Sequence, residues 1–145
     1  PLTILRISSV YGQRNRSDQI IPRFTRKALR NEPINLYGNN SRDFIHIADV
    51  IEAILSAIKL EQNNLFNIGT GKKFSNQFIL KKIIEITKSQ SEVLRLEKLG
   101  GYDFVCDISK ATEKLGIKPK ISIERGLVDE ISWHKIKNDE LLSGE

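Results

Sequence analysis

The sequence predicts an α/β fold with a small sheet and several helices. Short runs of β-branched and apolar residues, which indicate strands, alternate with segments whose apolar residues recur at helical spacing. Turn clusters such as Gly38-Asn39-Asn40 separate these segments. The length of 145 residues, 39% of them hydrophobic and 28% charged, suits one ordinary globular domain. Because the predicted strands are short, we expect this chain to contain little sheet of its own.

The chain opens with a predicted strand and helix. Thr3 to Ser8 is β-branched and apolar, which favours a strand. Ser17 or Asp18 can cap a helix that runs to about Arg30, with Pro22 in its first turn, where a missing N–H costs little. Its expected buried side consists of Ile20, Ile21, Phe24, Ala28 and Leu29.

The middle of the chain predicts three strands and two helices. We expect strands from Ile34 to Tyr37, through Phe44, Ile45 and Ile47, and from Leu65 to Ile68. Helical spacing of apolar residues predicts a helix from Ala48 to Leu60. Ser75 is expected to cap the next helix, which turns Phe78, Ile79, Ile83 and Ile86 inward.

The last third predicts two strands and two helices. Val93 to Leu96 and Phe104 to Cys106 are the strand candidates. Asp107 or Ser109 is expected to cap a short helix that ends at Gly116. Ser122 is expected to open a final helix through Trp133 to about Lys137, followed by a frayed tail after Asn138.

The net charge of +5 is concentrated in one segment. The stretch from Gln13 to Arg30 contains six basic residues and one acidic residue, and basic and acidic residues balance elsewhere. One interpretation is a solvated helix face. The other is an anion site for phosphates or nucleic acid.

The composition also bears on location and completeness. No apolar stretch approaches the roughly 20 residues of a membrane span, and no signal peptide is visible. The single cysteine, Cys106, cannot form an internal disulfide, so we expect a reducing, cytoplasmic location. The chain contains no methionine and opens inside an apolar run. We therefore expect a fragment whose missing motifs lie upstream.

Taken singly, the residues that could carry chemistry are weak candidates. His46 and His134 lack the neighbours of a metal site, and His46 could instead bond a carboxylate from a strand. Gly69-x-Gly71 lacks the third glycine of a dinucleotide-binding loop, so a turn is favoured. Arg42, beside a turn, could bind a phosphate bidentately or form a salt bridge to Asp43 or Asp49.

Six motifs occur in a fixed order: Leu5 to Gly12, Ile20-Ile21-Pro22, Ile34 to Gly38, Arg42 to Asp49, Phe66 to Gly71, and Asp107 to Ala111 with Leu115 to Pro119. Together they closely resemble the C-terminal half of the extended short-chain dehydrogenase/reductase family. Its members include NAD-dependent nucleotide-sugar epimerases and dehydratases, such as UDP-glucose 4-epimerase and dTDP-glucose 4,6-dehydratase.

The resemblance implies the substrate-binding part of a two-domain, NAD-dependent enzyme. It assigns residues 1–137 to this part, residues 1–12 being a late strand and turn of a missing Rossmann domain, and leaves 138–145 as a flexible tail. In the family, the missing domain supplies the NAD loop and the catalytic Tyr-x-x-x-Lys pair. No tyrosine of this chain has a lysine four residues later. The chain alone is therefore expected to have no catalytic residue and no activity.

The resemblance also implies a binding site for a nucleotide-diphosphate sugar. Arg42 matches the diphosphate-binding arginine, and Leu36-Tyr37 matches the segment that lines the nucleobase, although a core role for Tyr37 remains open. Gln19 matches a polar substrate contact, with an exposed cap residue as the alternative. Ser9 stands where the family usually has an asparagine.

Three further positions follow from the resemblance. The family's second phosphate-binding arginine aligns with Glu97 or, after a one-residue deletion, with Lys98, which we favour because glutamate repels phosphate. Phe104 falls near the wall beside the sugar. Ile7 falls where some relatives touch the nicotinamide.

We expect the parent enzyme to be a cytoplasmic, homodimeric epimerase most like UDP-glucose 4-epimerase. A nucleotide-sugar 4,6-dehydratase is the alternative within the family. Outside it, the alternatives are a non-catalytic relative or a nucleic-acid-binding module that uses Arg14 to Arg30. The nucleic-acid reading is less favoured, because Phe24 is the only aromatic residue in that segment.

Overall fold

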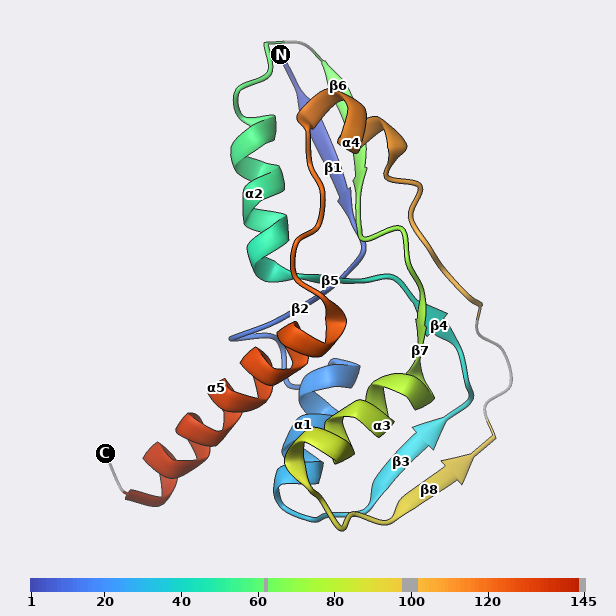
Figure 1. Ribbon diagram of the computed structural model, residues 1–145, viewed down its shortest axis with the longest axis vertical. Helices are drawn as coiled ribbons and strands as arrows, with labels where there is room; N and C mark the ends of the chain where they lie inside the picture. The colour runs from blue at the N-terminus through green and yellow to red at the C-terminus, as the bar shows by residue number, and fades with distance from the viewer. Residues whose placement is uncertain (62, 98–101, 144–145) are drawn as a thin grey trace.

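A computed structural model describes residues 1–61, 63–97 and 102–143, with side chains up to residue 136. It confirms the α/β class, because short strands and helices alternate along the chain (Figure 1). The strands are β1 Thr3–Ile7, β2 Ser9–Tyr11, β3 Ile34–Tyr37, β4 Ser41–Arg42, β5 Phe44–His46, β6 Asn64–Ile68, β7 Phe74–Ser75 and β8 Val93–Leu96. The helices are α1 Ile20–Leu29, α2 Ile47–Ala57, α3 Asn76–Thr87, α4 Ser109–Leu115 and α5 Ile123–Ser143.

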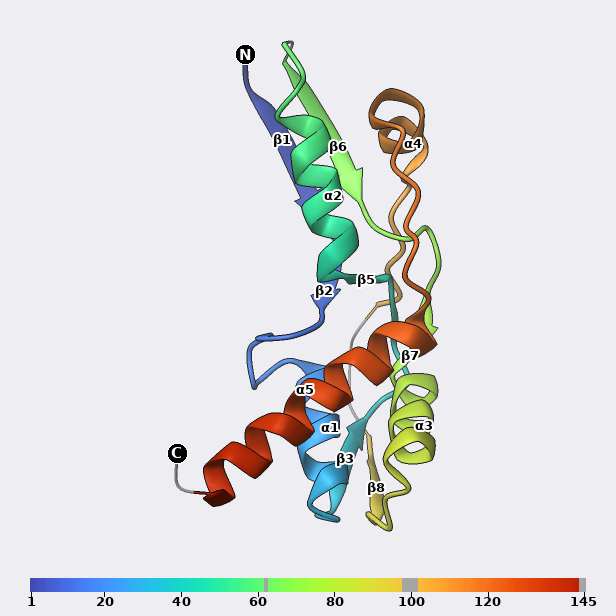
Figure 2. The same ribbon diagram turned by 60° about the vertical axis from the view of Figure 1, so that its left-hand side comes forward.

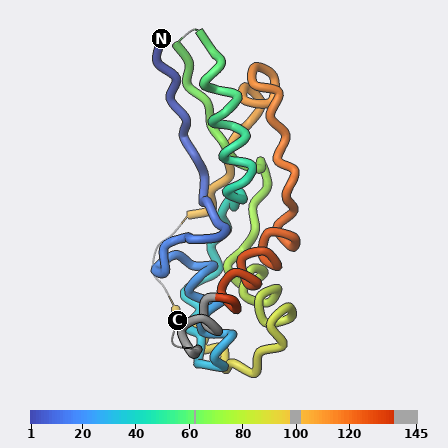
Figure 3. The backbone as a smooth tube through the Cα atoms, turned by 90° about the vertical axis from the view of Figure 1, so that its left-hand side faces the viewer, coloured from blue at the N-terminus to red at the C-terminus, as the bar shows by residue number. Residues whose placement is uncertain are grey.

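The described strands pair two by two. Strands β1 and β6, β2 and β5, and β3 and β8 are parallel, whereas β4 and β7 are antiparallel. The pairs are spread along the long axis of the molecule, with β1 and β6 at the N-terminal end and β3 and β8 at the other end (Figures 1 and 3). Side-chain packing and polar links, rather than one continuous ladder, must therefore hold the pairs together.

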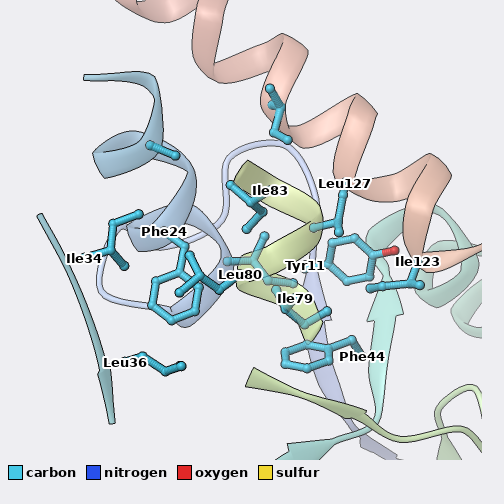
Figure 4. Packing of buried hydrophobic residues seen from close by; sticks show 13 residues of the cluster. Tyr11, Phe24, Ile34, Leu36, Phe44, Ile79, Leu80, Ile83, Ile123 and Leu127 are labelled. Atoms are coloured by element: carbon cyan, nitrogen blue, oxygen red, sulfur yellow. The ribbon is translucent and has the colours of Figure 1, made fainter. Parts of the chain in front are cut away.

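Two hydrophobic clusters fill the two ends. One packs α2 and α4 against β6 and consists of Ile45, Val50, Ala53, Phe66, Ile68 and Ala111. The larger one lies among α1, α3 and α5 (Figures 2 and 4), and its largest fully buried side chains include Phe24, Ile79 and Leu127. The β2–β5 pair lies between the two ends, so the loops beside it can contact residues of both ends.

The predicted caps agree with the structure at three helices. The Ser75 hydroxyl accepts a hydrogen bond from Phe78 N–H at the start of α3, and that of Ser122 accepts one from Arg125 N–H at the start of α5. Gly116, with φ +65°, ends α4 in the left-handed conformation that glycine tolerates. At the other end of α4 the prediction was wrong, because the N-cap is Ile108 rather than Asp107 or Ser109 and makes no side-chain capping hydrogen bond.

Helix α1 begins differently from the prediction. Its N-cap is Gln19, which makes no side-chain capping hydrogen bond, rather than Ser17 or Asp18. The Asp18 carboxylate instead forms an ion pair with Arg16, at 2.6 Å. Helix α2 also starts one residue early, because Ile47 is its first residue and His46 is its N-cap.

Two predictions near the C-terminus were wrong. Residues 104–106 form no strand, because the Phe104 N–H donates to Ser41 O and the Cys106 N–H to a side chain. Helix α5 continues past Lys137 to Ser143. No glycine or proline stands between Gly126 and Gly144 in the sequence, so nothing local stops the helix earlier.

One face of α2 is apolar and exposed. Val50, Ala53 and Ala57 of α2 are buried, whereas Ile51, Ile54 and Leu55 of α2 are exposed, as are Leu2 and Ile4 at β1 and Ile58 just after α2. We name these six residues, which are 40–73% exposed, the outer apolar face. Within the described residues, no helix is long and apolar enough to cross a membrane.

The start of α5 packs closely on β2. Tyr11 is 2% exposed, and its ring lies directly over Gly126, where a Cβ atom would overlap the Tyr11 hydroxyl and ring. Burial raises the pKa of Tyr11 far above its ordinary range, with Asp49 and Glu130 adding to the effect. One helical turn later, a carboxylate oxygen of the fully buried Glu130 accepts a hydrogen bond from Gly12 N–H at 2.6 Å.

This contact predicts that Gly126→Ala destabilises the protein. Helix propensity alone would make alanine more stable by about 1 kcal/mol. The overlap with Tyr11 should instead lower the free energy of unfolding by about 1–3 kcal/mol. Urea denaturation measures the change, with Val128→Ala on the exposed side of α5 as the control. A Gly126→Ala protein as stable as the control would contradict this packing.

Candidate functional site

The Asp43 carboxylate joins three segments that are distant in sequence. Asp43 lies between β4 and β5 and is completely buried. One oxygen accepts from Thr70 N–H at 2.8 Å and from the Thr70 hydroxyl at 2.6 Å. The other accepts from Gly71 N–H at 3.0 Å and from Cys106 N–H at 3.2 Å. These four bonds hold the loop after β6 and the segment before α4 against β4.

This geometry fits a turn at Gly69-Thr70-Gly71 rather than a dinucleotide loop. A loop that binds phosphate must aim free N–H groups at its ligand. Here the N–H groups of Thr70 and Gly71 already donate to Asp43. A Cβ atom on Gly69 would also meet Asp43 and Cys106, so the turn is filled by the protein itself. These residues do not fit NAD.

Arg42, next to Asp43 on β4, is held by the backbone and not by an acid. Its Nη1 donates to the carbonyl oxygens of Ser41 and Tyr102, and its guanidinium lies 4.7 Å from the centre of the Tyr102 ring. Among the described residues no carboxylate lies within ion-pairing distance of it. The alternative of a salt bridge to Asp43 or Asp49 was wrong, because both carboxylates accept backbone N–H groups elsewhere.

A second carboxylate fixes the segment that holds Arg42. Asp103 accepts a hydrogen bond from Ser41 N–H at 2.9 Å and pairs with Lys73 Nζ at 2.8 Å. The Lys73 ammonium, followed by the Ser41 N–H, lowers the pKa of the Asp103 carboxyl. The Phe104 N–H completes the link by donating to Ser41 O. The backbone around Tyr102 is therefore tied to Ser41, the residue before Arg42.

Arg42 lines a cavity of about 270 Å³. The cavity lies between β2, the first turn of α1, the end of β3 and the start of α3. Its polar lining consists of Ser9, Asn15, Gln19, Asn40 and Asn76 with the two arginines Arg23 and Arg42. Phe24, Tyr37 and Phe44 supply aromatic surface. Arginine and amide donors beside aromatic rings suit an anionic ligand that carries a planar ring.

The structure brings together four of the residues that the sequence singled out. Arg42, Tyr37, Gln19 and Ser9 all line the cavity. Leu36 is 5% exposed and packs in the core instead (Figure 4), so this segment offers the cavity the Tyr37 ring.

The other predicted positions lie elsewhere. Phe104 and Ile7 are each 40% exposed and do not line the cavity. Lys98 lies outside the described residues. Sequence reasoning missed the amides of Asn15, Asn40 and Asn76, because single asparagines in turns and after caps carry no pattern of their own.

The two histidines serve the fold. His46 Nδ1 accepts a hydrogen bond from Ala48 N–H at the start of α2, so the predicted bond to a carboxylate was wrong. His134 Nε2 lies 3.6 Å from Glu130 within α5. The described part of the chain contains no group of three or more potential metal ligands.

Comparison with known protein families agrees with the α/β fold and with a cavity suited to an anionic ligand. Residues 1–69 match the NAD dependent epimerase/dehydratase family. This match confirms the resemblance seen in the motifs, and the chain aligns with the C-terminal half of such enzymes.

Particular relatives are similar over nearly the whole chain. UDP-glucuronate 4-epimerase of Thermodesulfobacterium geofontis is 33% identical over 97% of this chain and 45% of its own length. dTDP-D-glucose 4,6-dehydratase of Mus musculus is 29% identical over 93% of this chain and 41% of its own. The structure of UDP-glucose 4-epimerase from Thermotoga maritima with UDP-glucose superimposes with a TM-score of 0.89 at 32% identity, covering 94% of this chain and 46% of that one. The chain thus spans somewhat less than half the length of these relatives.

The Asp43 cluster predicts a strong effect of Asp43→Asn. An asparagine presents one acceptor and two donors to four groups that all donate, so buried N–H groups lose their partners. We expect the free energy of unfolding to fall by on the order of 3 kcal/mol. Asp18→Asn, which breaks an exposed ion pair, is the control and should leave the urea midpoint almost unchanged. Equal urea midpoints for the two variants would contradict this assignment.

Proposed function

We propose that this chain is the nucleotide-sugar-binding part of an NAD-dependent nucleotide-sugar epimerase most like UDP-glucose 4-epimerase. The observation that carries the proposal is Arg42, a cation with no carboxylate within ion-pairing distance among the described residues, in a cavity rich in amides. Its fork can grip a diphosphate bidentately. Tyr37, 40% exposed at the rim, is available to the nucleobase, and Ser9 and Gln19 to the diphosphate and sugar.

The catalytic tyrosine, its lysine and most of the NAD site belong, in this proposal, to the rest of the enzyme. Two features of the fold support a second part. Strand β1 is paired on one side, by β6, in the described structure. The outer apolar face, whose six apolar residues are each at least 40% exposed, lies beside it. Residues 1–12 then continue a parallel sheet of the missing part, and Ile7, at the end of β1, packs near the nicotinamide.

The remaining assignments follow the same proposal. Lys98 binds the second phosphate, and Phe104 lies near the sugar. The parent enzyme is a cytoplasmic homodimer. This chain alone has no activity. A 4,6-dehydratase is the second candidate, favoured by the similarity to the mouse dehydratase.

The contacts made by the basic segment Arg14 to Arg30 argue against the nucleic-acid alternative. Arg16 and Arg30 pair with Asp18 and Glu32, and Arg26 donates to Ser17 O. Arg23 lines the cavity rather than an open face. Two of the six cations of the segment are thus paired with carboxylates, and a third faces the cavity.

The test is to supply the complete protein with NAD and a panel of UDP-, dTDP- and GDP-sugars. We expect an epimerised sugar from at least one of them. A 4-keto-6-deoxy product would favour the dehydratase. No turnover and no stabilisation by any nucleotide sugar would refute both.

Arg42→Gln should weaken binding of the nucleotide sugar by about 10- to 100-fold, the effect of losing a charge-assisted hydrogen bond. Isothermal titration calorimetry measures the loss. Arg125→Gln on α5, whose arginine pairs with Asp129, is the control and should bind normally. Equal affinities of the two variants would remove Arg42 from the site.

The 145-residue chain by itself should self-associate through the free edge of β1 and the outer apolar face. Light scattering at increasing concentration checks this, and Leu55→Glu, at a position 52% exposed, should reduce the association. A monodisperse monomer of the unmodified chain would contradict it.

A further inference from the structure

Arg23 connects the cavity described above to a second, smaller one. It lies in the first turn of α1 and lines both the cavity of about 270 Å³ and an adjoining one of about 100 Å³. Phe24 and Tyr37 also line both. The smaller cavity is completed by Lys27, Ile34 and Asn35. Arg23 therefore stands between the larger cavity and a smaller, partly aromatic recess.

The guanidinium of Arg23 is positioned but not neutralised. It lies 5.6 Å from the centre of the Phe24 ring, and that ring is 1% exposed. Among the described residues, no carboxylate lies within ion-pairing distance of Arg23. Arg30, two turns later on the same helix, has Glu32 at 3.8 Å. The donors of Arg23 are thus left for a ligand.

The opposite wall of the recess is also fixed in place. The Asn35 amide donates a hydrogen bond to the Tyr37 hydroxyl at 3.3 Å. Ile34 is completely buried beneath, so the recess has an apolar floor, an aromatic side and one cationic edge. A flat heteroaromatic ring with acceptors on its edge matches these surfaces.

We propose that Arg23 determines base specificity by donating to a ring carbonyl of uracil or thymine. This inference rests on the proposed function, since it assumes that Arg42 holds the diphosphate and Tyr37 borders the base. Guanidinium is a donor only. Uracil and thymine present the carbonyl acceptors O2 and O4. Adenine presents an amino donor in place of O4 and only ring nitrogens as acceptors, so it matches the guanidinium less well.

The experiment is calorimetric titration of the complete protein with UDP and ADP, which share the ribose and diphosphate and differ in the base. The unmodified protein should prefer UDP. Arg23→Ala should weaken UDP binding by about 10- to 100-fold and change ADP binding by less than about twofold. Arg30→Ala is the matched control and should bind both as before. A thermal melt of each variant verifies folding.

These variants test the role of Arg23 separately from the proposed function. Arg42→Gln should weaken UDP and ADP alike, because both carry the diphosphate. If Arg42→Gln does so while Arg23→Ala binds UDP normally, or weakens UDP and ADP equally, the role of Arg23 is overturned and the proposed function stands. A preference for GDP that Arg23→Ala abolishes would overturn the assignment to uracil or thymine. Failure of the unmodified protein to bind any nucleotide would overturn both.

Discussion

The buried carboxylate of Asp43 is the interaction on which the site depends. Among the described residues the strands form separate pairs and not one continuous sheet, so β4 could not hold its place by ladder hydrogen bonds alone. Four donors from Thr70, Gly71 and Cys106 converge on Asp43 instead. Because Arg42 is the preceding residue, the same bonds that satisfy this buried charge also fix the backbone from which the guanidinium extends. A charge buried in this way is tolerable only when its hydrogen bonds are complete.

Two other buried carboxylates, Asp49 and Glu130, also accept backbone N–H groups from loops, although one oxygen of Glu130 has no hydrogen-bond partner among the described residues. Asp49 accepts the N–H groups of Lys120 and Ile121, which fixes the segment that leads into α5. Glu130 accepts the Gly12 N–H, which fixes the turn after β2. In each case an acid on a regular element holds a loop that has no regular partner. The two apolar clusters supply most of the burial, and these acids set the position of the loops around the cavity.

Periodicity and caps predicted the elements that are stabilised locally, such as α3 after Ser75 and α4 before Gly116. These patterns failed where a partner that is distant in the sequence decides the structure. Strands β4 and β7 are two residues each and form because they pair with one another. The β-prone residues 104–106 form no strand, because Ser41 and Asp43 accept the hydrogen bonds of the Phe104 and Cys106 N–H groups. For the site, motif order found Arg42 and Tyr37, whereas Asn15, Asn40, Asn76 and Arg23 reach the cavity only through the packing of α1 and α3, which leaves no pattern in the sequence.

The contact between Arg42 and the carbonyl of Tyr102 has an entropic consequence. An arginine side chain carries about 2 kcal/mol of rotamer entropy, which a mobile residue loses when it grips a ligand. Here the backbone carbonyls of Ser41 and Tyr102 and the Tyr102 ring already restrict the side chain. The side-chain entropy of Arg42 is therefore lost when the protein folds and not when the ligand binds. An anion that enters the cavity binds a preorganised cation, so more of the interaction energy contributes to affinity.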